Sequence, residues 1–83
     1  MLSIKVLGPG CENCKRLEWL TERATSHLGI EAQIEKVTDY TMIMEYPILS
    51  TPGLVINEKL VASGRIPSEA EITTFLTNAL SEA

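Results

Sequence analysis

The chain has 83 residues, of which 45% are hydrophobic and 22% charged, with a formal net charge of −4 at pH 7. This length suffices for one compact domain and is too short for two, so residues 1–83 are expected to form a single domain. An acidic chain offers no basic surface for nucleic acid or an anionic membrane. No apolar run reaches the length of a signal peptide core or a membrane span. We therefore expect a cytoplasmic monomer whose partners are proteins or small molecules.

The first half of the chain predicts a strand, a helix and a second strand. Apolar and polar residues alternate over residues 2–6, and Gly8-Pro9-Gly10 ends this strand. Apolar residues then recur every three or four positions over Cys11–Leu28, and Gly29 suits the left-handed position after a helix. The predicted inward face comprises Cys14, Leu17, Leu20 or Thr21, Ala24 and Leu28. Alternation returns over residues 30–37, and a right-handed crossover makes the two strands parallel.

A short helix and a hairpin follow in the second half. Asp39 is placed to cap a helix over residues 40–45. Residues 54–56 and 60–62 are two short strands whose spacing requires a hairpin. The turn lacks the usual glycine, so we expect either a positive φ at Glu58 or a longer loop.

The last predicted element is a helix that opens at a capping box. Ser68-Glu69-Ala70-Glu71 has the spacing of that motif, in which the first and fourth residues satisfy each other's backbone N–H groups. The predicted buried stripe comprises Ile72, Phe75, Leu76, Ala79 and Leu80. The order of elements is therefore βαβαββα.

The methionine-rich stretch at residues 42–46 allows two interpretations. Met42, Ile43, Met44 and Tyr46 could form a soft surface near the cysteines that accepts varied protein partners. The more usual role of such residues is the buried face of a short helix, and this is the prediction that we adopt.

The only two cysteines, Cys11 and Cys14, lie three residues apart at the predicted start of the first helix. In a reducing cytosol such a pair is more often redox-active or metal-binding than a permanent bridge. The helix start lowers the pKa of the Cys11 thiol, whereas Cys14 lies on the apolar face and is less accessible. This asymmetry suits thiol–disulfide exchange, in which Cys11 attacks a substrate disulfide and Cys14 then resolves the mixed disulfide.

Metal binding is the alternative use of the same two thiolates. A tetrahedral zinc site needs two further ligands, and the only histidine, His27, lies about four helical turns from Cys11. A linear site for copper(I) or mercury(II) needs only the two sulfurs. A soft-metal carrier therefore remains the second interpretation.

Three segments resemble a known family: Gly8-Pro9-Gly10-Cys11-Glu12-Asn13-Cys14, Ser50-Thr51-Pro52-Gly53-Leu54-Val55-Ile56 and Ala62-Ser63-Gly64-Arg65-Ile66-Pro67-Ser68. They are similar to the compact thioredoxin fold, and closely resemble the small thioredoxin-like redox-active disulfide proteins of archaea and bacteria. The resemblance covers nearly the whole chain. It implies an α/β fold with a four-stranded mixed sheet of order 2-1-3-4, three flanking helices, and the activity of a protein-disulfide reductase.

The resemblance also implies site residues and partners. Cys11 and Cys14 would form a reversible disulfide, and the bond between Thr51 and Pro52 would be cis, with Thr51, Pro52 and Gly10 binding an extended substrate segment. No nucleotide fingerprint is present, so no bound cofactor is expected. The electrons would come from an external thioredoxin-reductase-like enzyme that uses flavin and NADPH, and the substrates would be proteins containing disulfides. Glu12-Asn13 departs from the usual residues between the cysteines, so a redox potential is not carried over.

Overall fold

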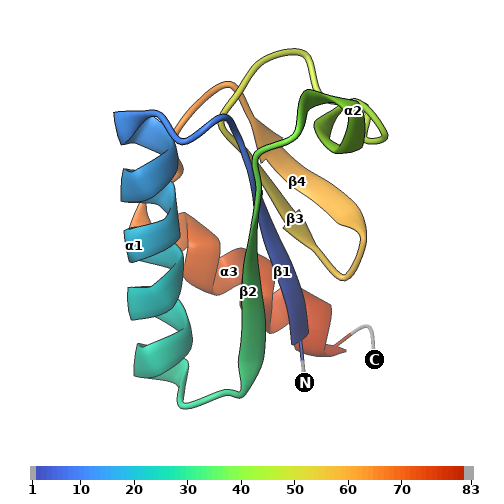
Figure 1. Ribbon diagram of the computed structural model, residues 1–83. Helices are drawn as coiled ribbons and strands as arrows, with labels where there is room; N and C mark the ends of the chain where they lie inside the picture. The colour runs from blue at the N-terminus through green and yellow to red at the C-terminus, as the bar shows by residue number, and fades with distance from the viewer. Residues whose placement is uncertain (1, 82–83) are drawn as a thin grey trace.

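The computed structural model describes residues 2–81 and has the predicted βαβαββα order (Figure 1). Each helix and strand begins and ends within two residues of its predicted limits. The elements are β1 (Leu2–Leu7), α1 (Glu12–Leu28), β2 (Ala32–Val37), α2 (Tyr40–Ile43), β3 (Gly53–Ile56), β4 (Lys59–Ser63) and α3 (Glu69–Ser81). Within residues 2–81, no helix is long and apolar enough to cross a membrane.

The four strands form one mixed sheet in the order β2-β1-β3-β4, which confirms the predicted strand order. β1 runs parallel to β2 and antiparallel to β3, and β3 pairs antiparallel with β4. In the middle of the sheet, Ile4 pairs with Ile34 on one side and Ile56 on the other. β1 is therefore a central strand, and its carboxyl end leads directly towards α1.

Helices cover both faces of the sheet, and each face has its own hydrophobic cluster. α1 and α3 pack on the face that Ile4 and Val6 present, and the cluster there comprises Leu2, Ile4, Val6, Leu17, Ala24, Leu54, Ile56, Ala62, Ile72 and Leu76. The opposite face carries a smaller cluster around α2, made of Leu7, Val37, Ile43, Ile48 and Val55. Because successive strand residues point to opposite faces, β1 and β3 contribute to both clusters.

The ends of α1 follow the local sequence signals, whereas its buried face differs in part from the prediction. Gly29 has φ 66° and donates its N–H to the carbonyl groups at the end of the helix, as predicted. Thr21 is fully buried, while Leu20 is only partly buried, and the Thr21 hydroxyl donates to the Leu17 carbonyl at 2.8 Å. The prediction that Leu28 faces inward is wrong, because the side chain, in the last position of the helix, is 36% exposed.

α2 is a single turn with one inward side chain. The Asp39 carboxylate accepts a hydrogen bond from the Thr41 N–H at 2.8 Å, which confirms the predicted cap. Ile43 is buried, but Met42 and Met44 are 46% and 68% exposed, so the predicted burial of the two methionines is wrong. A four-residue helix can direct only about one side chain towards the sheet, because 3.6 residues complete a turn.

The hairpin between β3 and β4 closes over two residues with positive φ. Asn57 has φ 50° and Glu58 has φ 68°, and the residues on either side pair with each other. These angles are those of a type I′ turn, which matches the twist of the two strands. The predicted positive φ at Glu58 is therefore confirmed.

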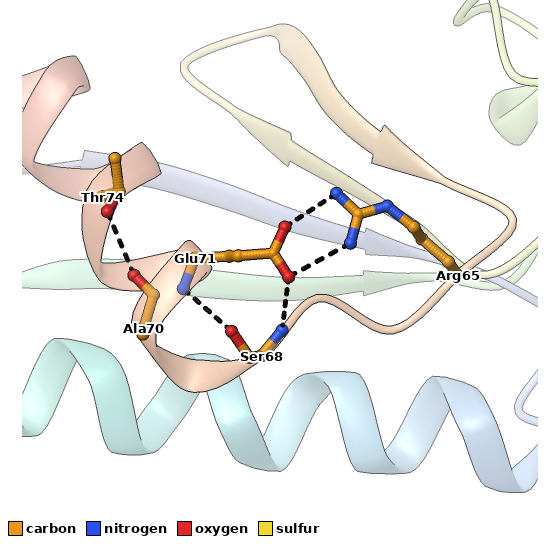
Figure 2. A network of polar contacts seen from close by, with 5 residues as sticks. All are labelled: Arg65, Ser68, Ala70, Glu71 and Thr74. Carbon is orange, nitrogen blue, oxygen red and sulfur yellow. Dashed lines mark hydrogen bonds and ion pairs between the residues drawn. The ribbon is translucent and has the colours of Figure 1, made fainter.

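The capping box of α3 is formed as predicted (Figure 2). The Glu71 N–H donates to the Ser68 hydroxyl at 3.2 Å, and the Ser68 N–H donates to the Glu71 carboxylate at 3.1 Å. Arg65 adds two hydrogen bonds to the same carboxylate. At the other end of α3, the predicted burial of Leu80 is wrong, because the side chain, in the last turn of the helix, is 45% exposed.

Candidate active site

The two cysteines lie at the start of α1, just after the carboxyl end of β1. Cys11 is the N-cap residue, with extended backbone angles, and its side chain is exposed. Cys14 lies one turn further along and is only 5% exposed, on the side of α1 that packs against the sheet. Gly10 turns the chain into the helix with φ 94°, a conformation that favours glycine.

The two free thiols are coupled by hydrogen bonds. The Cys14 N–H donates to Cys11 Sγ at 3.3 Å, because an N-cap side chain lies over the unpaired N–H groups of the first turn. Hydrogen bonds from the Cys14 thiol and then from the Cys14 N–H lower the pKa of the Cys11 thiol. Burial, and then the hydrogen bond to Cys11, raise the pKa of Cys14. The exposed sulfur is therefore the one that ionises more easily.

The loop before β3 lies beside the cysteine pair, although it is about forty residues away in sequence. The peptide bond between Thr51 and Pro52 is cis, Thr51 is half-buried and Pro52 is buried. A Cβ placed on Gly8 would overlap Cys14 Sγ and would also lie 3.9 Å from Thr51 Cβ. Figure 1 shows the start of α1 and the loop that precedes β3 at the same end of the sheet. The structure thus brings Gly8, Cys14 and Thr51 together.

Two features that hold this loop were not foreseen from the sequence. The Gly64 N–H, just after β4, donates to the Pro52 carbonyl at 2.9 Å. Gly64 has φ 73°, and a Cβ there would overlap the Ser50 hydroxyl. The glycine is therefore required both by its own backbone and by its close approach to the loop.

A polar network lies on the α2 face, where Lys5 extends from β1. Its ammonium group donates to Glu58 Oε1 at 2.7 Å and to the Tyr46 hydroxyl at 3.1 Å, and that hydroxyl donates to Glu58 Oε2 at 3.1 Å. The contacts with Glu58 and then Tyr46 raise the pKa of Lys5, and Lys5 lowers the pKa of Glu58. The network joins β1, the hairpin turn and the loop after α2. It could not be predicted because its members are far apart in sequence.

The histidine considered as a metal ligand has another partner. His27 Nδ1 lies 2.6 Å from Glu69 Oε2, and Arg23 Nε lies 3.0 Å from the other oxygen of that carboxylate. Within the described part of the chain, no group of three or more His, Cys, Asp or Glu residues is arranged to hold a metal ion.

Comparison with known proteins identifies the family. The Thioredoxin domain family matches residues 2–77. The chain is 36% identical to a thioredoxin of Methanothermobacter thermautotrophicus, over 93% of this chain and 100% of that protein. It is 38% identical to a thioredoxin of Methanocaldococcus jannaschii, over 96% of this chain and 92% of that protein.

A solved structure has the same fold. It is a thioredoxin-2 described as a component of the malaria parasite protein secretion machinery, with a TM-score of 0.70 and 12% identity, over 94% of this chain and 82% of that one. At this identity the likeness concerns the fold alone. The family match and the two relatives of 36% and 38% identity show that the chain belongs to the thioredoxin domain family and is a thiol–disulfide oxidoreductase.

Proposed function

We propose that the protein is a protein-disulfide reductase in which Cys11 is the attacking thiolate and Cys14 the resolving thiol. The observation that supports this assignment is the pair of opposite pKa shifts on two adjacent sulfurs, one exposed and one buried. An exposed thiolate can reach a disulfide on another protein. A buried thiol with a raised pKa stays protonated until the first bond has formed.

The reaction proceeds by two exchanges. The Cys11 thiolate attacks one sulfur of the substrate disulfide, so that a Cys11–substrate disulfide forms and the other substrate sulfur leaves as a thiolate. Cys14 then loses its proton and attacks Cys11 Sγ, which forms the Cys11–Cys14 disulfide and releases the second substrate thiolate. The two leaving thiolates take up protons from solvent or from Cys14. Two electrons thus pass from the dithiol to the substrate.

We assign Thr51, Pro52 and Gly10 to substrate binding. Thr51 lies beside Cys14 across Gly8, so a segment paired with the Thr51 backbone would pass close to the sulfurs. At Gly10, no atom apart from the glycine and its two chain neighbours lies within 4 Å of the position that a Cβ would occupy, which leaves open space at this turn. The substrate class that fits is an extended polypeptide segment containing a disulfide.

The remaining parts of the proposal concern the setting of the reaction. The chain acts as a single-domain monomer of residues 1–83 in the cytoplasm, without a bound cofactor. A flavin- and NADPH-dependent reductase of the thioredoxin-reductase type returns the Cys11–Cys14 disulfide to the dithiol.

The central test is reduction of insulin disulfides with dithiothreitol as electron donor, followed by turbidity, for the wild type, Cys11→Ser and Cys14→Ser. A second series replaces dithiothreitol by NADPH and a thioredoxin reductase. The wild type should accelerate the reaction, Cys11→Ser should not, and Cys14→Ser should trap a covalent mixed disulfide visible by mass spectrometry. Absence of both turnover by the wild type and trapping by Cys14→Ser would contradict the proposal.

The soft-metal carrier is distinguished in the same samples. Two adjacent free thiols are the observation that favours it. Retention of one copper(I) per chain through gel filtration, together with no insulin turnover, would replace the reductase by the carrier.

The pH dependence of Cys11 reactivity tests the assignment of the attacking sulfur. Because the pKa of Cys11 is lowered, its alkylation by iodoacetamide should be half-maximal at a lower pH than that of an unperturbed cysteine thiol, and should fall as the pH drops through that midpoint. Cys14→Ala removes the donating thiol and should move the midpoint upward. Cys14→Ser keeps a hydroxyl donor and should move it less. An unchanged midpoint in both variants would show that Cys14 does not tune Cys11.

A further inference from the structure

Gly8 follows β1 and is buried beside the cysteine pair. Its φ lies outside the left-handed region that Gly10, Gly29 and Gly64 adopt, so its backbone does not by itself require glycine. The atoms that surround Gly8, however, leave no room for a side chain. A Cβ at this position would overlap Cys14 Sγ, lie 3.3 Å from Cys14 Cβ and touch Thr51 Cβ at 3.9 Å.

We infer that Gly8 is a positioning residue, whose missing side chain provides the room in which the reduced Cys14 thiol lies beside Cys11 and Thr51. The inference rests on the proposed roles of Cys11 and Cys14. Gly8 itself forms no bond with the substrate. It acts by determining where the sulfur of Cys14, the resolving cysteine, lies.

The backbones on both sides of this contact are held in place. The Gly8 N–H donates to the Val37 carbonyl at 2.9 Å, at the end of the parallel pair β1 and β2. The Cys14 N–H donates to Cys11 Sγ, and the Lys15 N–H donates to the Cys11 carbonyl at 3.0 Å. A methyl group on Gly8 is therefore accommodated mainly by rotation of the Cys14 side chain.

This rotation changes the balance between the dithiol and the disulfide. In the free thiol form, Cys14 Sγ occupies the space beside Gly8, so an added methyl group disfavours this form. In the disulfide, Cys14 Sγ is drawn onto Cys11 Sγ, because a disulfide bond is much shorter than a contact between two thiols. Gly8→Ala should therefore make the protein a stronger reductant.

The first experiment is a double-mutant cycle on unfolding by urea in excess dithiothreitol, with the wild type, Gly8→Ala, Cys14→Ala and the double variant. Gly8→Ala should raise the unfolding equilibrium constant at least tenfold more with Cys14 present than with Cys14→Ala. An equal factor in both backgrounds would overturn the inference. If Gly8→Ala alone does not fold, the double variant should fold, and failure of both would also overturn it.

The second experiment measures the equilibrium of the Cys11–Cys14 dithiol with reduced and oxidised glutathione, in which the protein disulfide forms as oxidised glutathione is reduced. Gly8→Ala should shift the equilibrium constant about tenfold towards the protein disulfide, or about 30 mV towards a more negative potential. No shift, or a shift towards the dithiol, would overturn the inference. Insulin turnover by the wild type is measured separately, so a failure of the proposed function can be distinguished from a failure of the inference about Gly8.

Gly53→Ala is the matched control. It adds the same methyl group to the strand that pairs with the end of β1, but the nearest atom there is Ile48 Cδ1 at 2.5 Å, and no cysteine atom is among the three nearest. This variant should lose stability without shifting the glutathione equilibrium. An equal shift in Gly53→Ala and Gly8→Ala would assign the effect to general packing damage and overturn the inference.

Discussion

On one face of the sheet lie α1 and α3, with 17 and 13 residues, whereas the other face has only the four residues of α2 and the loops around it. The helical face holds the larger buried cluster. On the α2 side, Tyr40, Met42, Met44 and Leu49 remain exposed. The cysteines belong to the helical face, while the chain that leads to Thr51 comes from the α2 face.

This difference indicates that the cysteine pair and the loop before β3 are held in place to different degrees. Cys11 caps and Cys14 belongs to a long helix anchored by buried side chains, which keeps the backbone of the two cysteines in place. The loop before β3 depends on a thinner cluster and on single hydrogen bonds, such as the one from Gly64 to Pro52. Substitutions on the two faces should therefore differ in their cost.

The largest effect is expected from Leu17→Ala on the helical face. Leu17 is fully buried, one turn after Cys14, so the substitution leaves a cavity between α1 and the sheet. We expect the free energy of unfolding to fall by about 2 to 5 kcal/mol, measured by urea denaturation. Leu49→Ala is the control, because this side chain is 97% exposed and should cost less than about 0.5 kcal/mol. Equal costs would show that α1 does not anchor the site.

Ile43→Ala applies the same test to the α2 face. Ile43 is 1% exposed, but it is the one buried residue of a single helical turn that can move inward to fill the space. The cost should lie near the lower end of the same range, about 2 kcal/mol. A cost above that of Leu17→Ala would reverse the comparison between the two faces.

Ser68→Ala probes the start of α3 on the helical face. Figure 2 shows the Ser68 hydroxyl and the Glu71 carboxylate bonded to each other's backbone N–H groups. Loss of the hydroxyl should lower the free energy of unfolding by about 1 kcal/mol, with the melting temperature as a second measure. Ser68→Thr keeps the hydroxyl and should recover most of the loss. No difference between the two variants would mean that the cap adds little to the stability of α3.

The smallest effect is expected from Met42→Gln and Met44→Gln on the α2 face. Both side chains are exposed, so each variant should change the free energy of unfolding by less than about 0.5 kcal/mol. Urea denaturation of the two variants beside Ile43→Ala provides the measurement. A loss near 2 kcal/mol would indicate that the methionines are buried and that the α2 face is as well covered as the other.

Local signals were sufficient for most elements and for the place of the cysteines. The period of α1, Gly29 after it, and the box of Ser68 and Glu71 depend on residues within a few positions of each other, so they can be recognised in a single sequence. The same holds for Cys11 at the helix start. The lowered pKa of the Cys11 thiol follows from that local geometry, whereas the pKa of Cys14 is raised first by its burial, which depends on tertiary packing.

Other features depended on how far each element is covered by its neighbours. The burial of Thr21 in place of Leu20, and the exposure of Leu28 and Leu80 in the last turns of α1 and α3, depend on which side chains the neighbouring elements contact. The exposure of the two methionines follows from the length of α2, which is a single turn. A hydrophobic period gives the direction of a helical face but not the extent of the surface that it meets.

The amino-acid sequence by itself determined the order of the elements, the helix ends and the position of a dithiol at a helix start, because these arise from contacts within one or two turns of chain. Only the tertiary structure placed Thr51 beside Cys14, brought Gly64 to Pro52 and filled the space at Gly8 with a sulfur atom. These contacts join residues from different strands and loops. Their geometry depends on the packing of the whole sheet, which no short segment encodes.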